Sequence, residues 1–207
     1  MITAHGVELR WQTQALAVRA QGRGLAIETP AGTVQARHAV LATGPWSGQL
    51  VAGGLPDLVV QRQTVGYFEV DAPPAATAAG RFPVWARIGR TAEEFVYGLP
   101  PTGSHALKLA RHRTTGAGCD PEAAAPPHDA GALLALARAH LTCPVRGLAA
   151  SETCLYTMAP AHRLFVHRDA TLPVTTIAAC SGHAFKFGPV IGREAADLVL
   201  ADRPPIG

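Results

Sequence analysis

The fold is decided by two stretches near the C-terminal end, Ser151-Glu-Thr-Cys-Leu-Tyr-Thr-Met158 and Cys180-Ser-Gly-His-Ala-Phe-Lys-Phe187. Between them, the β-branched run Val174-Thr-Thr-Ile177 predicts a buried strand that leads into a glycine-containing turn. Each stretch places one reactive side chain, Cys154 or Lys186, among apolar and small neighbours. A thiol there can attack an electrophile, and an ammonium there can hold a carboxylate. Because α/β proteins usually bind ligands at such turns, we expect a ligand site here.

Composition narrows the class of protein. The 207 residues are 48% hydrophobic, which suffices for a sizeable core. The net charge is only +3 and the basic residues are scattered, so a nucleic-acid partner or an anionic membrane surface is not expected. No window approaches the roughly 18 apolar residues of a membrane helix, and no leader sequence is recognisable. We therefore expect a cytoplasmic protein without a membrane partner.

Cysteine, histidine and lysine usage adds three expectations. The four cysteines form no Cys-x-x-Cys pair, which argues against a zinc ribbon or a disulfide framework. The nine histidines are dispersed, so no metal site is expected. Of 18 basic side chains only two are lysines, Lys108 and Lys186, and the other 16 are arginines. Both lysines lie in apolar segments, where a solvated charge is less expected. Either these positions need a compact ammonium that a guanidinium cannot replace, or the two lysines occur there by chance.

The order of predicted elements indicates mixed sheet layers at both ends of the chain, with an antiparallel sheet inserted between them. Consecutive short strands without intervening helices are typical of an antiparallel sheet. Asp129 is expected to cap an amphipathic helix that reaches about Leu141, and Pro189 to begin another that reaches about Leu200. Strands are predicted at Val7–Arg10, Ala15–Ala20, Leu25–Thr29, Thr33–Ala36, His38–Ala42, Val59–Val70, Val84–Ile88, Glu94–Tyr97, Ala106–Arg111, Leu148–Tyr156, Leu164–His167 and Val174–Ala178.

The two stretches resemble the C-terminal part of the monomeric sarcosine oxidase and N-methyltryptophan oxidase group, flavoenzymes of the D-amino-acid oxidase superfamily. In that family a Cys-Met/Leu-Tyr-Thr segment carries the cysteine bonded to the flavin. Its Ser-Gly-His-Gly-Phe-Lys-Phe segment carries a lysine that binds the substrate carboxylate. The resemblance implies an α+β chain that holds an incomplete α/β FAD-binding fold. Its domains would be a residual FAD-binding hairpin and strand at 1–50, an antiparallel substrate domain at 51–146, and a return to the FAD-binding domain at 147–207.

The resemblance also assigns roles to individual residues. Cys154 would hold FAD covalently, and Lys186 would bind the substrate carboxylate. Lys108, on a strand similar to the family's Leu-Lys-Leu-Gly-Tyr-His, would promote the reaction with oxygen. Its spacing to His112 keeps both side chains on one strand face. His112, Tyr97 and Tyr156 would line the catalytic cavity, and residues near the flavin would be Gly44, Trp46, Gly182, His183 and Phe185.

Two departures limit what the resemblance implies. The chain contains no Gly-x-Gly-x-x-Gly element, which would hold the pyrophosphate of FAD. Three alternatives account for this: a truncated gene product, an excerpt of a longer protein, or one half of a split enzyme whose partner is the missing N-terminal half. Ala159-Pro160-Ala161 and Ala184 also differ from the family pattern. The predicted function is an FAD-dependent oxidoreductase that converts the C–N bond of a secondary amino acid to an imine and reduces oxygen to hydrogen peroxide. The alternative is a non-catalytic fragment or binding module that does not hold FAD by itself.

Overall fold

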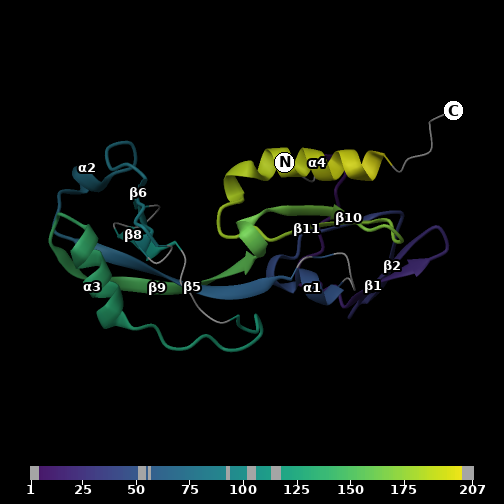
Figure 1. Ribbon diagram of the computed structural model, residues 1–207, viewed down its shortest axis with the longest axis horizontal. Coiled ribbons are helices and arrows are strands. Elements are labelled where there is room, and N and C mark those ends of the chain that lie inside the picture. Colours follow the sequence, from purple (N-terminus) through teal and green to yellow (C-terminus); the bar gives the residue numbers. More distant parts are fainter. Residues whose placement is uncertain are drawn as a thin grey trace. The chain divides into compact units, whose positions relative to one another are not determined.

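The computed structural model describes residues 5–50, 55, 57–91, 94–101, 106–112 and 118–201. The chain divides into two units, one of Met1–Leu58 with Ala159–Gly207 and one of Val59–Met158. Each unit is described by itself below, with the elements labelled as in Figure 1.

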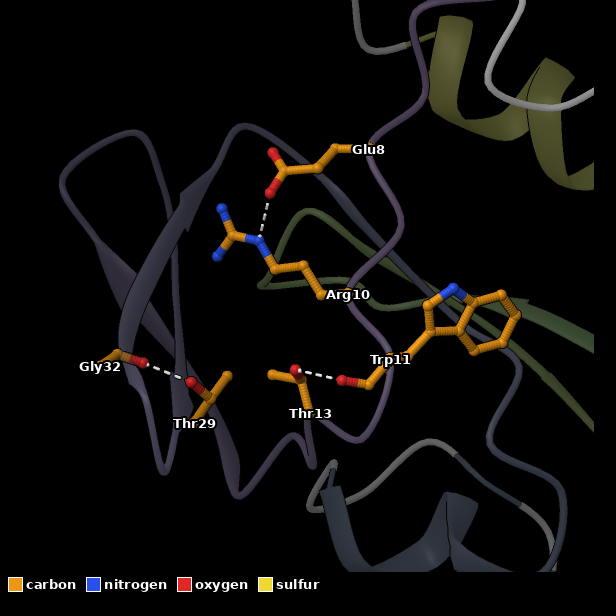
Figure 2. A network of polar contacts seen from close by, with 6 residues as sticks. All are labelled: Glu8, Arg10, Trp11, Thr13, Thr29 and Gly32. Atoms are coloured by element: carbon orange, nitrogen blue, oxygen red, sulfur yellow. Dashed lines mark hydrogen bonds and ion pairs between the residues drawn. The ribbon is translucent and has the colours of Figure 1, made fainter.

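A three-stranded antiparallel sheet opens the first unit. It has the order β1 (Ala17–Gln21), β2 (Gly24–Thr29) and β3 (Gly32–Ala36). A tight turn joins β2 to β3: the Thr29 hydroxyl donates to the Gly32 carbonyl at 2.7 Å, and Gly32 adopts a φ of 118°, which favours glycine (Figure 2). This part of the prediction is confirmed, with β1 beginning two residues later than expected.

The segment before β1 differs from the prediction. Residues 7–10 form no strand, although Val7–Arg10 was predicted as one. Glu8 and Arg10 instead pair with each other at 2.7 Å (Figure 2). Trp11 is 80% exposed, and its carbonyl accepts a hydrogen bond from the Thr13 hydroxyl at 3.1 Å. Alternation of apolar and polar residues was therefore not sufficient, because a strand also needs a neighbouring strand for its backbone groups.

The second sheet of this unit has the order β10 (Phe165–Arg168), β11 (Val174–Ala178) and β4 (Ala39–Leu41). β10 is antiparallel to β11, whereas β4 is parallel to it. A buried cluster is formed by Leu25 of β2, Ala39 and Leu41 of β4, and Val174 of β11. The helix α4 (Gly188–Leu200) packs along β10 and β11 (Figure 1). β11 has the predicted bounds, and α4 begins one residue before the predicted Pro189.

A five-stranded antiparallel sheet forms the second unit. Its order is β6 (Trp85–Arg87), β7 (Val96–Leu99), β8 (Leu107–Arg111), β5 (Val59–Val70) and β9 (Val145–Met158). β9 pairs with β5 along its whole length, with register shifts near Phe68 and Val70. Residues 147–158 therefore belong to this unit by their contacts, whereas the sequence analysis placed them with the C-terminal part.

One face of this sheet is covered by the helix α3 (Ala130–His140). Phe68, Val96 and Leu109 of the sheet meet Leu133, Leu136 and Ala137 of the helix in a buried cluster. Asp129 caps the helix as predicted, since its side chain accepts a hydrogen bond from the Ala132 amide at 2.9 Å. Two single-turn helices, α1 (Ser47–Leu50) and α2 (Pro74–Thr77), were not predicted.

The predicted fold class is confirmed: helices accompany mixed and antiparallel sheets, and in the sequence the residues of the five-stranded antiparallel sheet come between the two chain segments of the first unit. No helix in the described part of the chain is long and apolar enough to span a membrane. The described residues also contain no group of three or more His, Cys, Asp or Glu side chains that could hold a metal ion.

Candidate functional site

The candidate site lies on the face of the five-stranded sheet opposite α3. Leu107 and Leu109 of β8 are 1% and 0% exposed and belong to the core side. Because successive strand residues point to opposite faces, Lys108 and Ala110 point to the other face. We call this the site face; it carries Tyr67, Tyr97, Lys108, His112, Glu152, Cys154 and Tyr156.

Strand register places these side chains in neighbouring rows across the sheet. Lys108 lies opposite Tyr67 on one side and Leu99 on the other. In the next row, Tyr97 pairs with Ala110, and Glu152 lies on the far side of β5. Cys154 and Tyr156 follow along β9, opposite Gln63 and Gln61. The sheet thus brings residues that are up to 89 positions apart in sequence, from Tyr67 to Tyr156, onto one face.

His112 is the centre of an aromatic cluster on this face. Its amide donates to the Phe95 carbonyl at 2.7 Å, which extends the pairing of β8 with β7 by one residue. The imidazole lies 4.6 Å from the Phe95 ring, 6.2 Å from Tyr97 and 5.7 Å from Tyr156, measured between ring centroids. Its Nδ1 is 3.5 Å from the Tyr156 hydroxyl. These contacts place the imidazole between two phenols and give it a defined orientation.

Tyr97 keeps its proton over the physiological range. Burial raises the pKa of the Tyr97 hydroxyl above its ordinary value, and the electrostatic interaction with Cys154 raises this pKa further, while a hydrogen bond with Tyr156 opposes both. A neutral phenol can donate a hydrogen bond to a ligand. Cys154 itself is a partly buried free thiol on the same face, so its sulfur is available for covalent chemistry.

A second polar group lies at the other end of the site face. The Tyr67 hydroxyl donates to Glu152 Oε2 at 2.9 Å, and the Lys108 ammonium lies 5.9 Å from the centre of the Tyr67 ring. Burial raises the pKa of Tyr67, and the hydrogen bond to Glu152 and its charge add to this effect. Among the described residues, the site face therefore presents the Lys108 cation, the Glu152 carboxylate, the Cys154 thiol and several aromatic rings.

The remaining predicted residues lie in the first unit, at one edge of its second sheet. Gly44 follows β4 and Gly182 follows β11, and these strands are parallel neighbours, so both turns lie beyond the carboxyl ends. Both glycines have positive φ, 54° and 74°. Ser47 is fully buried next to the first turn and donates to the Gly44 carbonyl at 2.8 Å, while Trp46 is 37% exposed.

Lys186, His183 and Phe185 follow the second of these turns. The Lys186 ammonium donates to the His183 carbonyl at 2.9 Å and lies 4.8 Å from the Phe187 ring centre. His183 Nε2 is 3.0 Å from the carbonyl of His162, a residue that precedes β10, and this contact fixes the position of the imidazole. Phe185 is 100% exposed, a large apolar surface for a single side chain.

The structure thus brings five of the predicted residues together in the second unit: Tyr97, Lys108, His112, Cys154 and Tyr156. The other six lie in the first unit. Sequence reasoning missed three neighbours on the site face, Tyr67, Phe95 and Glu152. Phe95 could have been found, because it precedes Tyr97 by two residues on a strand and so shares its face. Tyr67 and Glu152 carried no such signal, since their meeting depends on the register of β5 with β9.

Comparison with known proteins identifies the family of this chain. The model of the family described as FAD dependent oxidoreductase matches residues 1–198. This chain belongs to the FAD dependent oxidoreductase family. It is 26% identical over 185 residues to the monomeric sarcosine oxidase of Arthrobacter sp. (strain TE1826), which covers 86% of this chain and 46% of that protein. It is 29% identical over 189 residues to human peroxisomal sarcosine oxidase, covering 86% and 47%.

A third relative is the N-methyl-L-tryptophan oxidase of Salmonella agona, 29% identical over 191 residues, covering 87% of this chain and 48% of that protein. Solved structures of two other proteins share the fold. NikD, an amino acid oxidase essential for nikkomycin biosynthesis, superposes with a TM-score of 0.78 at 23% identity, covering 99% of this chain and 55% of NikD. Glycine oxidase from Geobacillus kaustophilus gives 0.68 at 17% identity, covering 94% and 50%. The chain spans about half the length of the curated relatives it matches.

The residues present on the site face fit a flavin ring. Such a ring is flat and largely apolar, and the cluster of Phe95, Tyr97, His112 and Tyr156 offers aromatic surface beside a free thiol and an ammonium. The pyrophosphate of FAD has no such match in this sequence, because the sequence contains no Gly-x-Gly-x-x-Gly element to hold it.

Proposed function

We propose that this chain carries the substrate-side residues of an FAD-dependent amine oxidoreductase that acts on secondary amino acids. Its relatives are named as oxidases of sarcosine and of N-methyl-L-tryptophan, both N-methyl amino acids. We infer the same class of small-molecule substrate here, with oxygen as the electron acceptor and a cytoplasmic location. No nucleic acid or membrane takes part in this proposal.

One observation carries the proposal: the five-stranded sheet gathers Tyr97, Lys108, His112, Cys154 and Tyr156 on one face. A random distribution of these side chains would place about half of them on the core side, under α3. Their chemistry is also complementary, because a thiol, a cation and neutral hydroxyls serve different steps of one reaction.

Each side chain has a role in this proposal. Bound FAD would supply the two-electron redox chemistry that couples oxidation of the amine, with loss of a hydride from the carbon next to the nitrogen, to reduction of oxygen, so that imine and hydrogen peroxide result. Cys154 provides the covalent attachment. Lys108 stabilises negative charge as oxygen is reduced. Tyr97, His112 and Tyr156 form the walls that orient the amine.

The first unit supplies the remaining roles. Lys186 pairs with the substrate carboxylate, after exchanging its hydrogen bond to the His183 carbonyl for the charged partner. Gly44 and Gly182 allow close approach of the backbone at the carboxyl ends of β4 and β11, and Trp46, His183 and Phe185 contact the flavin. In this proposal residues 1–50 and 147–207 serve FAD binding, with Cys154 of β9 as the attachment site, and residues 51–146 serve the substrate together with Tyr156 of β9.

The pyrophosphate of FAD needs residues from outside these 207. We infer that an N-terminal half, with a glycine-rich turn at a helix N-terminus, completes the nucleotide site, since the relatives are about twice as long. The absence of such a turn from this sequence also favours the second candidate function, a fragment or binding module that does not hold FAD by itself.

The test is the visible spectrum of the chain purified together with the N-terminal half that completes the nucleotide site, followed by hydrogen peroxide formation with a panel of amino acids. The proposal predicts a yellow protein that oxidises N-methyl amino acids faster than the corresponding primary amino acids. Lys186→Met should raise KM for these substrates more than it lowers kcat, because the lost contact is to the carboxylate. A chain that stays colourless and inactive with added FAD, even with the N-terminal half in place, would support the second candidate function instead.

A further inference from the structure

Lys108 lies between two cross-strand neighbours of different chemistry on the site face. Leu99 of β7 is its partner on one side, and Tyr67 of β5 on the other. Its neighbours in sequence, Leu107 and Leu109, are 1% and 0% exposed on the core side and cannot define where the ammonium lies. Leu99 offers only apolar surface. Of the two cross-strand neighbours, Tyr67 is therefore the one that can attract a cation.

The Tyr67 ring attracts the ammonium, and Glu152 holds the ring. Lys108 Nζ lies 5.9 Å from the ring centroid, a distance at which cation–π attraction operates. The Tyr67 hydroxyl donates to Glu152 Oε2 at 2.9 Å. A phenol that donates to a carboxylate is polarised by it, so its ring becomes richer in electrons and attracts a cation more strongly.

This arrangement spans three adjacent strands of one sheet. Glu152 lies on β9, Tyr67 on β5 and Lys108 on β8, and the strands are joined by backbone hydrogen bonds on both sides of β5. A lysine has a long, flexible stem and loses side-chain entropy when its ammonium is fixed. A partner fixed on a rigid sheet, and anchored at its own far end, can hold that ammonium at a defined place.

We propose that Tyr67, anchored by Glu152, is a positioning residue that holds the Lys108 ammonium in one place on the site face. The role of Lys108 rests on the proposed function, whereas the geometry is a property of the chain without any cofactor. Tyr67 acts through Lys108, and Glu152 acts through Tyr67.

The test uses the fact that the chain has only two lysines, Lys108 and Lys186. With ¹³C-labelled lysine, a proton–carbon correlation spectrum of the full chain contains two ε-CH₂ groups, and Lys108→Arg assigns them. A proton above an aromatic ring is shifted upfield by the ring current. We therefore expect the Lys108 ε protons upfield of a flexible lysine and different from each other.

Four variants separate the parts of this arrangement. Tyr67→Leu removes the ring and should move the Lys108 signals to the position of a flexible lysine. Tyr67→Phe and Glu152→Ala each remove one end of the same hydrogen bond, so both should cause the same partial shift, and the double variant should add nothing. Leu99→Ala, on the other flank of Lys108, is the matched control and should leave the upfield shift in place.

The signals of Lys186, which lies over Phe187 in the first unit, should stay constant in every variant and thereby report that the first unit is unchanged. Lys108 signals at the position of a flexible lysine in the native chain would overturn the proposal. So would signals that Tyr67→Leu leaves unchanged. If Tyr67→Leu does not fold, unchanged signals in both Tyr67→Phe and Glu152→Ala would overturn it.

Failure of the proposed function is distinguishable, because these spectra need no flavin. If the chain never binds flavin but shows the predicted shifts, the positioning role of Tyr67 stands and the oxidase assignment fails. In a flavin-loaded protein, Tyr67→Leu should slow the reaction with oxygen roughly 2- to 5-fold, the range of an exposed cation–π contact, and leave reduction by the amine unchanged.

Discussion

Replacing Lys108 by Met tests the electrostatic part of the proposed function. Methionine has a similar length and flexibility, and Lys108 is only partly buried on the site face, so the sheet should stay intact. The change removes one positive charge. A unit charge about 4–6 Å from a developing negative charge contributes about 3–4 kcal/mol at an effective dielectric constant of about 20. Solvent on the exposed side screens this to about half, which corresponds to roughly a 10- to 30-fold effect on rate.

Stopped-flow absorbance of the flavin-loaded protein separates the two half-reactions. Reoxidation by oxygen should slow by that factor in Lys108→Met, while anaerobic reduction by the amine should keep its rate. Lys108→Arg retains the charge and should lose much less, and Lys186→Met should affect substrate binding and not reoxidation. Equal reoxidation rates in Lys108→Met and the native protein would refute the reasoning, and so would a loss as large in Lys108→Arg as in Lys108→Met.

Three further predictions concern the sheet that carries the site. Asp129→Ala removes the cap of α3 and should lower the free energy of unfolding, measured in urea, by about 1 kcal/mol. The control Asp129→Asn keeps an oxygen that accepts the hydrogen bond of the Ala132 amide, so its free energy of unfolding should fall by less. Equal losses in the two variants would contradict the role of the hydrogen bond. Leu109→Ala leaves a cavity at a fully buried position and should lower the free energy of unfolding by about 2–5 kcal/mol in the same assay. A loss below about 1 kcal/mol would mean that no packed core lies behind the site face. The pKa of His140 is lowered below its ordinary 6.5, first by burial and then by Arg87 and Arg111. The unfolded chain then binds more protons near this pH, so stability should fall as the pH drops below about 6.5, and His140→Gln should weaken that dependence in pH-resolved urea titrations; an identical pH profile would exclude His140 as a source.

Elements with strong local signals could be predicted from the sequence. β5 and β11 have the predicted bounds, because runs of β-branched and apolar residues favour strands and turn residues mark their ends. The helix α3 follows from Asp129 at its cap and from its apolar positions. β9 extends three residues before Leu148 and two beyond Tyr156, because its pairing with β5 continues where its own pattern weakens.

Elements that depend on distant partners could not be predicted in this way. Val7–Arg10 alternates like a strand, but Glu8 and Arg10 pair with each other and the segment forms no ladder. At the site, the spacing of Lys108 and His112 correctly placed both on one face, because strand periodicity is local. The meeting of Tyr67 with Glu152, 85 positions apart, depends on the register of two paired strands, which a single sequence does not determine.

The intact mass of the chain after acid denaturation tests the central claim most directly. The account predicts a mass increase equal to one FAD that survives denaturation, is lost in Cys154→Ser and is kept in Cys143→Ser, a control thiol outside the site face. Flavin that is released on denaturation, a mass increase that persists in Cys154→Ser, or an unmodified chain isolated with its N-terminal half in place would each contradict the assignment of Cys154 as the covalent attachment site.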